Sequence, residues 1–214
     1  MALHLKIDQK NPPDQALVLA AEVIQAGGVV VYPTETVYGI GANAWNSGAV
    51  LRVQEIKHRA QPKPILVVVD SVEAASGVTD EVTPLARRFM ERFWPGPLTL
   101  VMRASTLLPK SLTLGRGTIG VRIPSNPVCL RLLTLCACPL TSTSANISGE
   151  TTAATAEEIE RELGPGVDLY LNAGALLVST PSTVLDVTGD RPRLLREGAI
   201  SFDQLTSVSP FIDR

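Results

Sequence analysis

The densest run of small hydrogen-bonding side chains lies at residues 140–149 (LTSTSANISG). An apolar start typical of a strand leads into consecutive serines and threonines and an asparagine, and the run ends at a glycine. Small polar side chains leave backbone N–H groups open to an anion, as in an anion-binding nest. A plain Ser/Thr turn has the same composition. A Ser-His-Asp hydrolase is a weak interpretation, because the run has no neighbouring histidine in the sequence.

A second candidate is the run at residues 32–41 (YPTETVYGIG), which follows an apolar stretch abruptly. It brings hydroxyls, a carboxylate and glycines into one turn. Loops at strand ends commonly carry binding groups, because the rigid scaffold positions them. Either an ordinary strand–helix connection or a strand-end ligand site fits this pattern.

Three basic residues stand at the expected end of a helix or inside an expected strand. Lys57 and Arg59 close a helical segment, where the helix dipole favours cations, so capping alone explains them. A lysine point charge beside an arginine fork also suits a triphosphate. Arg122 lies between apolar strand residues, so it needs an anionic partner. That partner is either an internal Asp or Glu or the carboxylate of a ligand.

The run at residues 115–120 (GRGTIG) matches the dinucleotide pattern G-x-G-x-x-G. That fingerprint must follow a strand and open a helix, whereas here a polar loop precedes it and an expected strand follows. The Walker pattern is absent from the sequence. Any nucleotide is therefore bound without either standard phosphate loop.

The composition describes a globular chain of 214 residues, 45% hydrophobic and 19% charged, with a net charge of −2. A globally basic nucleic-acid binder is disfavoured by this charge. The longest aliphatic stretch, residues 65–69, is far short of the roughly 20 residues of a membrane span. We expect one soluble cytoplasmic domain over residues 1–214. Zinc needs about four ligands with loop spacing, and the few cysteines and histidines do not supply them. Reduced core thiols are expected at Cys129, Cys136 and Cys138.

Apolar spacing and capping signals predict helices that alternate with short strands. Helices are expected to begin near residue 11, at 46 or 47, at 83–84, at 127 and after the capping-box pattern of Thr155 and Glu158. Strands are expected at 29–32, 65–69, 98–102, 118–123, 167–171, 183–187 and 193–195. The fold class is therefore α/β, and the strand-rich last third predicts a twisted mixed sheet with flanking helices.

Together these segments resemble the YrdC-like family, the threonylcarbamoyl-AMP synthases of tRNA modification. The resemblance runs from Gly27 to Gly198 and includes GGVVVYPTETVYGIGANA, the K-x-R of Lys57 and Arg59, WPGPLTLV, TIGVRIPSNP, STSANISG, PSTVLDV and LLREG. It implies an open fold with a concave basic face. Longer relatives add a C-terminal domain, so a chain that stops at Arg214 is similar to the short form.

The resemblance implies a nucleotidyltransferase that forms L-threonylcarbamoyladenylate from L-threonine, bicarbonate and ATP, and releases pyrophosphate. Mg²⁺ would accompany ATP, and no protein side chain is assigned as a metal ligand. A separate downstream enzyme would transfer the threonylcarbamoyl group to tRNA. The chain would then meet tRNA indirectly or weakly, and a membrane not at all.

The resemblance also implies residue roles. The threonine ligands would be Thr34, Arg122, Ser142 and Ser182. The ATP ligands would be Lys57, Arg59, Thr118, Ser144, Asn146, Thr152 and Arg196. Of these, Lys57 and Arg59 would be catalytic, because they would offset the charge that grows on pyrophosphate. Some relatives carry a histidine at the position of Val68, which predicts a more apolar pocket here.

Two other functions remain open. One is a double-stranded RNA or tRNA-binding module of the same fold without adenylating activity, although 4% aromatic content argues against single-strand stacking. The other is carbamoyl transfer, as in the related domain of the much longer hydrogenase-maturation proteins. The S-x-N pair, Ser144 and Asn146, favours the synthase.

Overall fold

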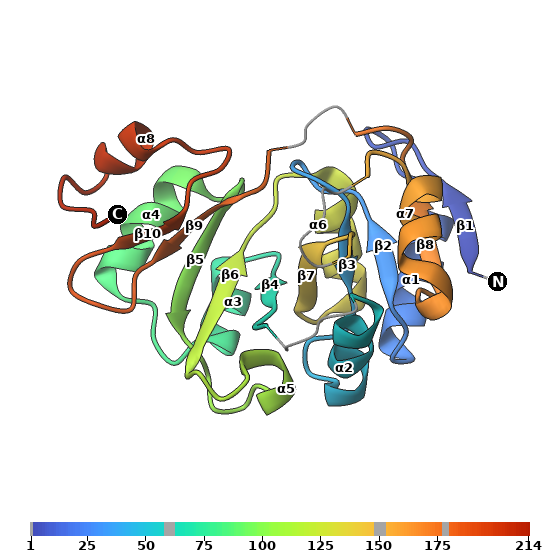
Figure 1. Ribbon diagram of the computed structural model, residues 1–214, viewed down its shortest axis with the longest axis horizontal. Helices are drawn as coiled ribbons and strands as arrows, with labels where there is room; N and C mark the ends of the chain where they lie inside the picture. The colour runs from blue at the N-terminus through green and yellow to red at the C-terminus, as the bar shows by residue number, and fades with distance from the viewer. Residues whose placement is uncertain (1, 58–62, 148–152, 177–179) are drawn as a thin grey trace.

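The computed structural model describes residues 2–57, 63–147, 153–176 and 180–214 (Figure 1). Its centre is a ten-stranded sheet in the order β1-β8-β2-β3-β7-β4-β6-β5-β9-β10. The strands are β1 (Leu3–Lys6), β2 (Val30–Tyr32), β3 (Gly39–Gly41), β4 (Leu66–Val68), β5 (Leu98–Arg103), β6 (Thr118–Arg122), β7 (Leu140–Ser144), β8 (Leu169–Asn172), β9 (Thr183–Asp186) and β10 (Arg193–Arg196). Four neighbouring pairs are parallel (β1–β8, β2–β8, β4–β6, β5–β9), and the other five are antiparallel. The predicted mixed sheet is confirmed.

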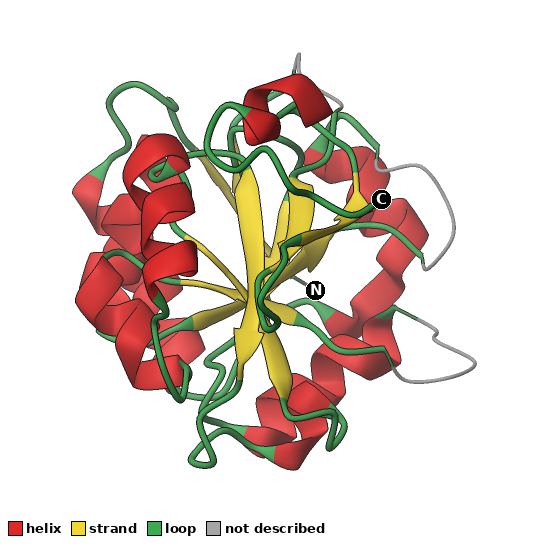
Figure 2. Cartoon of the chain, turned by 90° about the vertical axis from the view of Figure 1, so that its left-hand side faces the viewer, coloured by secondary structure: helices red, strands yellow, loops and turns green. Residues whose placement is uncertain are grey.

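The helices lie on both sides of the strongly twisted sheet (Figure 2). They are α1 (Asp14–Gln25), α2 (Ser47–Ile56), α3 (Val72–Val78), α4 (Pro84–Phe93), α5 (Lys110–Thr113), α6 (Pro127–Cys136), α7 (Ala156–Leu163) and α8 (Phe202–Thr206), with a 3₁₀ turn at Gly164–Gly166. Asn46, one of two predicted caps, accepts from the backbone of Ala49. The capping box of Thr155 and Glu158 is present. None of the helices in the described ranges is both long and apolar enough to cross a membrane.

Two hydrophobic cores cover the two faces of the sheet unequally. One face carries Val67, Val121 and Leu100 and packs into the larger core along much of the sheet. The other face packs against α1 and α6 through residues such as Tyr32 and Leu140. All three cysteines are free thiols, as predicted, and two of them are buried.

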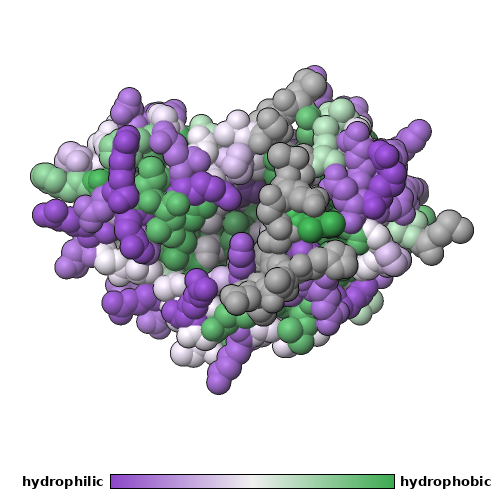
Figure 3. Space-filling view, in the orientation of Figure 1, coloured by the Kyte–Doolittle hydropathy of each residue, from purple (hydrophilic) through white to green (hydrophobic). Residues whose placement is uncertain are grey.

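That second face is left open beyond α1 and α6. Residues paired across strands point to the same face, and the register pairs Val101 with Gly120 and Thr99 with Val184. Apart from the buried Thr99, these residues are half-exposed. The space-filling view accordingly shows apolar side chains at the surface over β5, β9 and β10 (Figure 3). A ligand can therefore approach the sheet from this face.

The run at residues 32–41 forms a hairpin and not the strand–helix connection that was one of its two interpretations. Its last three residues are β3, which pairs antiparallel with β2 and β7. A side chain at Gly41 would place its Cβ 2.4 Å from the carbonyl oxygen of Thr141 and 2.8 Å from the ring of Tyr32. Glycine is required here because the neighbouring backbone approaches so closely. The strand is hard to foresee, since Gly-Ile-Gly has low strand propensity.

The dinucleotide-like run at 115–120 is a turn and a strand start, as predicted. Gly115 and Gly117 adopt positive φ angles of 72° and 67°, and β6 begins at Thr118. No helix follows the glycines directly. The strand instead carries Arg122 at its last position, next to the cavity described below.

Candidate active site

A cavity of about 470 Å³ opens where the β2–β3 loop, the ends of β6 and β7, and the segment before β9 meet. All four residues predicted for threonine line it, together with three of those predicted for ATP. The seven are Thr34, Arg122, Ser142, Ser144, Asn146, Ser182 and Arg196. Most of the residues that line it are polar, and Val37, Leu66 and Pro181 are its larger apolar members.

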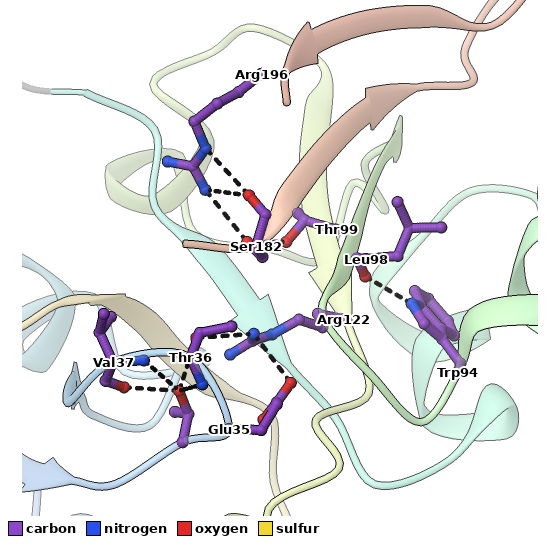
Figure 4. Close-up of polar contacts among 10 residues, drawn as sticks. Glu35, Thr36, Val37, Trp94, Leu98, Thr99, Arg122, Ser182 and Arg196 are labelled. Carbon is purple, nitrogen blue, oxygen red and sulfur yellow. Dashed lines mark hydrogen bonds and ion pairs between the residues drawn. The ribbon is translucent and has the colours of Figure 1, made fainter. Parts of the chain in front are cut away.

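Arg122 is only 4% exposed, and its guanidinium has an internal partner. Nη1 lies 3.2 Å from Oε1 of Glu35, with which it forms an ion pair, and 3.3 Å from Oγ1 of Thr36 (Figure 4). Of the two partners expected for this arginine, the internal carboxylate is therefore present. Arg122 still lines the cavity and can contact a ligand there.

The β2–β3 loop is held by the hydroxyl of Thr34. Its Oγ1 accepts from the backbone N–H of Thr36 at 3.1 Å and of Val37 at 3.2 Å, and donates to the Val37 carbonyl at 2.6 Å. This local side-chain bonding closes a tight turn. Thr34 thus presents the loop to the cavity, and its own proton is already engaged.

Ser182 and Arg196 form the opposite wall (Figure 4). Nε and Nη2 of Arg196 donate to the Ser182 carbonyl at 3.1 and 2.8 Å, and the Ser182 hydroxyl lies 3.0 Å from that of Thr99. Burial lowers the pKa of Arg196, and the nearby charge of Arg122 lowers it further. Two guanidiniums of like charge therefore face one cavity, which favours an anionic ligand.

Lys57 lies beneath the cavity and not in its wall. It follows α2 as the C-cap and is 2% exposed. Its Nζ donates to the carbonyl of Ser144 at 2.5 Å, and to the carbonyl and Oδ1 of Asn146 at 2.7 and 3.2 Å. The hydroxyl of Ser144 also donates to Oδ1 of Asn146. The ammonium therefore fastens the loop after β7, which goes beyond simple helix capping.

Of the other positions predicted for the site, Thr118 and Val68 do not line the cavity. Thr118 is at the opposite end of β6 from Arg122, paired with Arg103, and is not part of the described cavity wall. Arg59 and Thr152 lie outside the described residues. Val68 is fully buried between α6 and the sheet, so the apolar contribution expected from it comes from Leu66, two residues earlier.

Sequence reasoning did not single out Glu35 and Thr36 as site residues. Both lie in the run at residues 32–41, which was a candidate site segment. The expected need of Arg122 for an anionic partner was the one signal that could have indicated Glu35. The described parts of the chain contain no group of three or more His, Cys, Asp or Glu that could hold a metal ion.

Comparison with known proteins supplies the family. A family model named Sua5_yciO_yrdC, described as "Telomere recombination", matches residues 22–198. The threonylcarbamoyl-AMP synthase of Pyrococcus abyssi is 36% identical over 190 residues, covering 89% of this chain. The chain spans only 56% of that relative's length.

Solved structures agree with this assignment. The crystal structure of P. abyssi Sua5 complexed with L-threonine superposes with a TM-score of 0.92 at 32% identity, and the match covers all of this chain and 62% of Sua5. Escherichia coli YciO gives a TM-score of 0.87 at 31% identity, with 99% of this chain and all of YciO covered. This chain belongs to the Sua5/YciO/YrdC family.

Proposed function

We propose that this chain forms L-threonylcarbamoyladenylate and pyrophosphate from L-threonine, bicarbonate and ATP, as a nucleotidyltransferase. The observation that carries the proposal is that the buried Arg122 and the segment of Ser144 and Asn146 line the same cavity. A site for a joint reaction of an amino acid and a nucleotide needs both in one space. The threonine-bound P. abyssi relative, with the same fold, supports the assignment.

The amino-acid end of the cavity would hold the threonine carboxylate on Arg122. Charge-assisted bonds of a guanidinium to a carboxylate are among the strongest in proteins. The hydroxyls of Ser142 and Ser182, which also line the cavity, would pair with the threonine hydroxyl. With its carboxylate held by Arg122, threonine would have its amino group free to react with bicarbonate, which gives a carbamate and releases water.

The nucleotide end would receive the triphosphate on the loop after β7. The carbamate oxygen would attack the α-phosphorus, and pyrophosphate would leave in line. Because two anions approach one another, positive charge must surround them. Arg196 lines the cavity, and Lys57 lies directly beneath the loop. The roles of Arg59, Thr118 and Thr152 in ATP binding remain part of the proposal. We assign no general base.

Mg²⁺ enters the proposal as the ion that ATP carries, held by phosphate oxygens and water. This fits a site whose described residues offer hydroxyl and amide groups but no cluster of carboxylates. When bound, the ion would neutralise charge on the leaving phosphates. We further propose that residues 1–214 act as one domain and that a separate enzyme transfers the product's threonylcarbamoyl group to tRNA.

Pyrophosphate release by the purified chain tests the proposal. We expect release only when threonine, bicarbonate and ATP are all present, with one omission control for each. Valine should fail, because a site that pairs the threonine hydroxyl loses those bonds, whereas serine loses only a methyl and should react weakly. Equal turnover of threonine and valine would contradict a pocket that recognises the hydroxyl. No release, together with salt-sensitive binding of tRNA, would favour the RNA-binding module.

A further inference from the structure

Glu35 is a partly buried residue at the site, and the proposed reaction gives its carboxylate no role. It lies between Thr34 and Thr36 in the β2–β3 loop, and its side chain is 16% exposed. Both neighbours line the cavity, but within the described residues Glu35 does not. Its carboxylate therefore contacts Arg122 from behind the wall (Figure 4).

The three nitrogens of the Arg122 guanidinium stand in different surroundings. Nη1 is held by Glu35 and Thr36, whereas Nε is buried and has no acceptor among the residues that the structure describes. Nη2 makes no hydrogen bond to the described residues, yet it is not sealed off. Since Arg122 lines the cavity, Nη2 is the nitrogen offered to a ligand.

The charges around Arg122 explain why its contact with Glu35 is needed. Arg196 faces the same cavity and repels Arg122, and Glu35 is the one carboxylate that pairs with Arg122 in the described parts of the chain. A buried guanidinium without a counter-charge is costly and turns to find other acceptors. Held on one side only, Arg122 keeps a fixed orientation before the ligand arrives, which lowers the entropic cost of binding.

We propose that Glu35 is a positioning residue for the amino-acid carboxylate, because it holds Nη1 of Arg122 from behind so that Nη2 stays turned toward the substrate. The inference rests on the proposed function, in which Arg122 binds that carboxylate. Glu35 need not leave when the ligand binds, because the two carboxylates use different nitrogens. It acts through Arg122 and does not touch the substrate.

The test measures L-threonine binding to the full chain by calorimetry, and the KM values for threonine and ATP by pyrophosphate release. E35Q keeps the reach of the side chain but loses its charge, and we expect the threonine Kd to rise about tenfold, as for contacting residues that couple strongly. E35D keeps the charge but is one methylene shorter, so it should lie between E35Q and wild type. The ATP KM should not change. E22Q, on an exposed position of α1, is the matched control.

A double variant separates positioning from a general structural effect. In an R122A background, E35Q should leave the threonine KM where R122A alone puts it, because the residue acts only through the arginine. An added loss there would overturn the inference.

The other outcomes separate a failure of the proposed function from a failure of this inference. If wild type binds no threonine, the proposed function fails and this inference fails with it. If wild type binds threonine and E35Q binds it equally well or more tightly, only the inference is overturned. If E35Q does not fold, E35D decides, and a wild-type Kd in that variant overturns the inference.

Discussion

The two cations that the sequence indicated most strongly, Arg122 and Lys57, are both almost fully buried and yet use their donors in opposite ways. Arg122 gives one nitrogen to Glu35 and Thr36 and leaves Nη2 toward the cavity. Lys57 directs three hydrogen bonds to oxygens of the loop after β7. An ammonium has three N–H groups, so its bonds to the described residues already engage it strongly.

The difference indicates that the two proposed ends of the cavity are prepared for their ligands to different degrees. At the proposed amino-acid end, Arg122 has a donor available to an anion. At the proposed nucleotide end, Lys57, Ser144 and Asn146 are hydrogen-bonded to one another. A phosphate that binds Lys57 directly must first displace one of these bonds, whereas a phosphate that binds the loop finds it already held in place. We infer that Lys57 acts through the loop.

The largest expected effect is that of K57M, which keeps the apolar stem but removes the ammonium that donates to oxygens of Ser144 and Asn146. Hydrogen bonds to a charged group contribute about 1.5–3 kcal/mol each, and the Ser144 carbonyl keeps the backbone N–H of Asn146 as a second donor, so the variant should lose about 2–4 kcal/mol of stability. For a chain of this size, Tm should fall by about 5–15 °C. Thermal unfolding followed by circular dichroism measures this, with K110M on an exposed position as control.

The inferred difference between Lys57 and Arg122 would be contradicted if K57M melted at the wild-type temperature while its ATP KM rose steeply. Lys57 would then be a phosphate ligand, and the bonds to the loop would contribute little. A joint loss of stability and of ATP use is the expected result.

R122A should show the opposite pattern, with a large effect on threonine and none on ATP. Loss of a charged hydrogen bond is worth about 1.5–3 kcal/mol, or roughly a 10- to 150-fold rise in the threonine KM. R122K keeps the charge without the planar fork and should fall between R122A and wild type. Steady-state pyrophosphate release at varied threonine provides the measurement. An unchanged threonine dependence would remove Arg122 from the site.

Local patterns in the sequence predicted the positions of these residues but not their partners. Arg122 between apolar neighbours predicted a position in a strand and a counter-charge, and both are present. The identity of Glu35 as that counter-charge depends on pairing across 87 residues, and no local pattern encodes it. Lys57 likewise contacts a loop 87 residues away, so its position at a helix end indicated capping or phosphate binding equally well.

The fold was predictable where periodicity is strong and the segment is long enough to show it. The helix predicted from residue 127 is α6, Pro127–Cys136, because its apolar period and its starting proline agree. The short strands β1 and β3 escaped prediction, since each is stabilised by its neighbours more than by its own residues. Gly39–Gly41 is a strand only because β2 and β7 flank it.

The smallest expected effect is that of G198A, which tests whether Ser182 belongs to the proposed amino-acid end of the cavity. A Cβ at Gly198 would lie 2.3 Å from the Pro181 carbonyl oxygen and 2.7 Å from the Ser182 carbonyl carbon, so G198A must move this part of the wall. Because Ser182 is predicted to bind threonine, the threonine KM should rise about three- to fivefold, near 1 kcal/mol, while the ATP KM stays constant. G189A is the matched control, since a Cβ there has its nearest neighbour at 3.8 Å. A change in the ATP KM alone would assign Ser182 to the nucleotide end, together with Arg196, which is bound to its carbonyl.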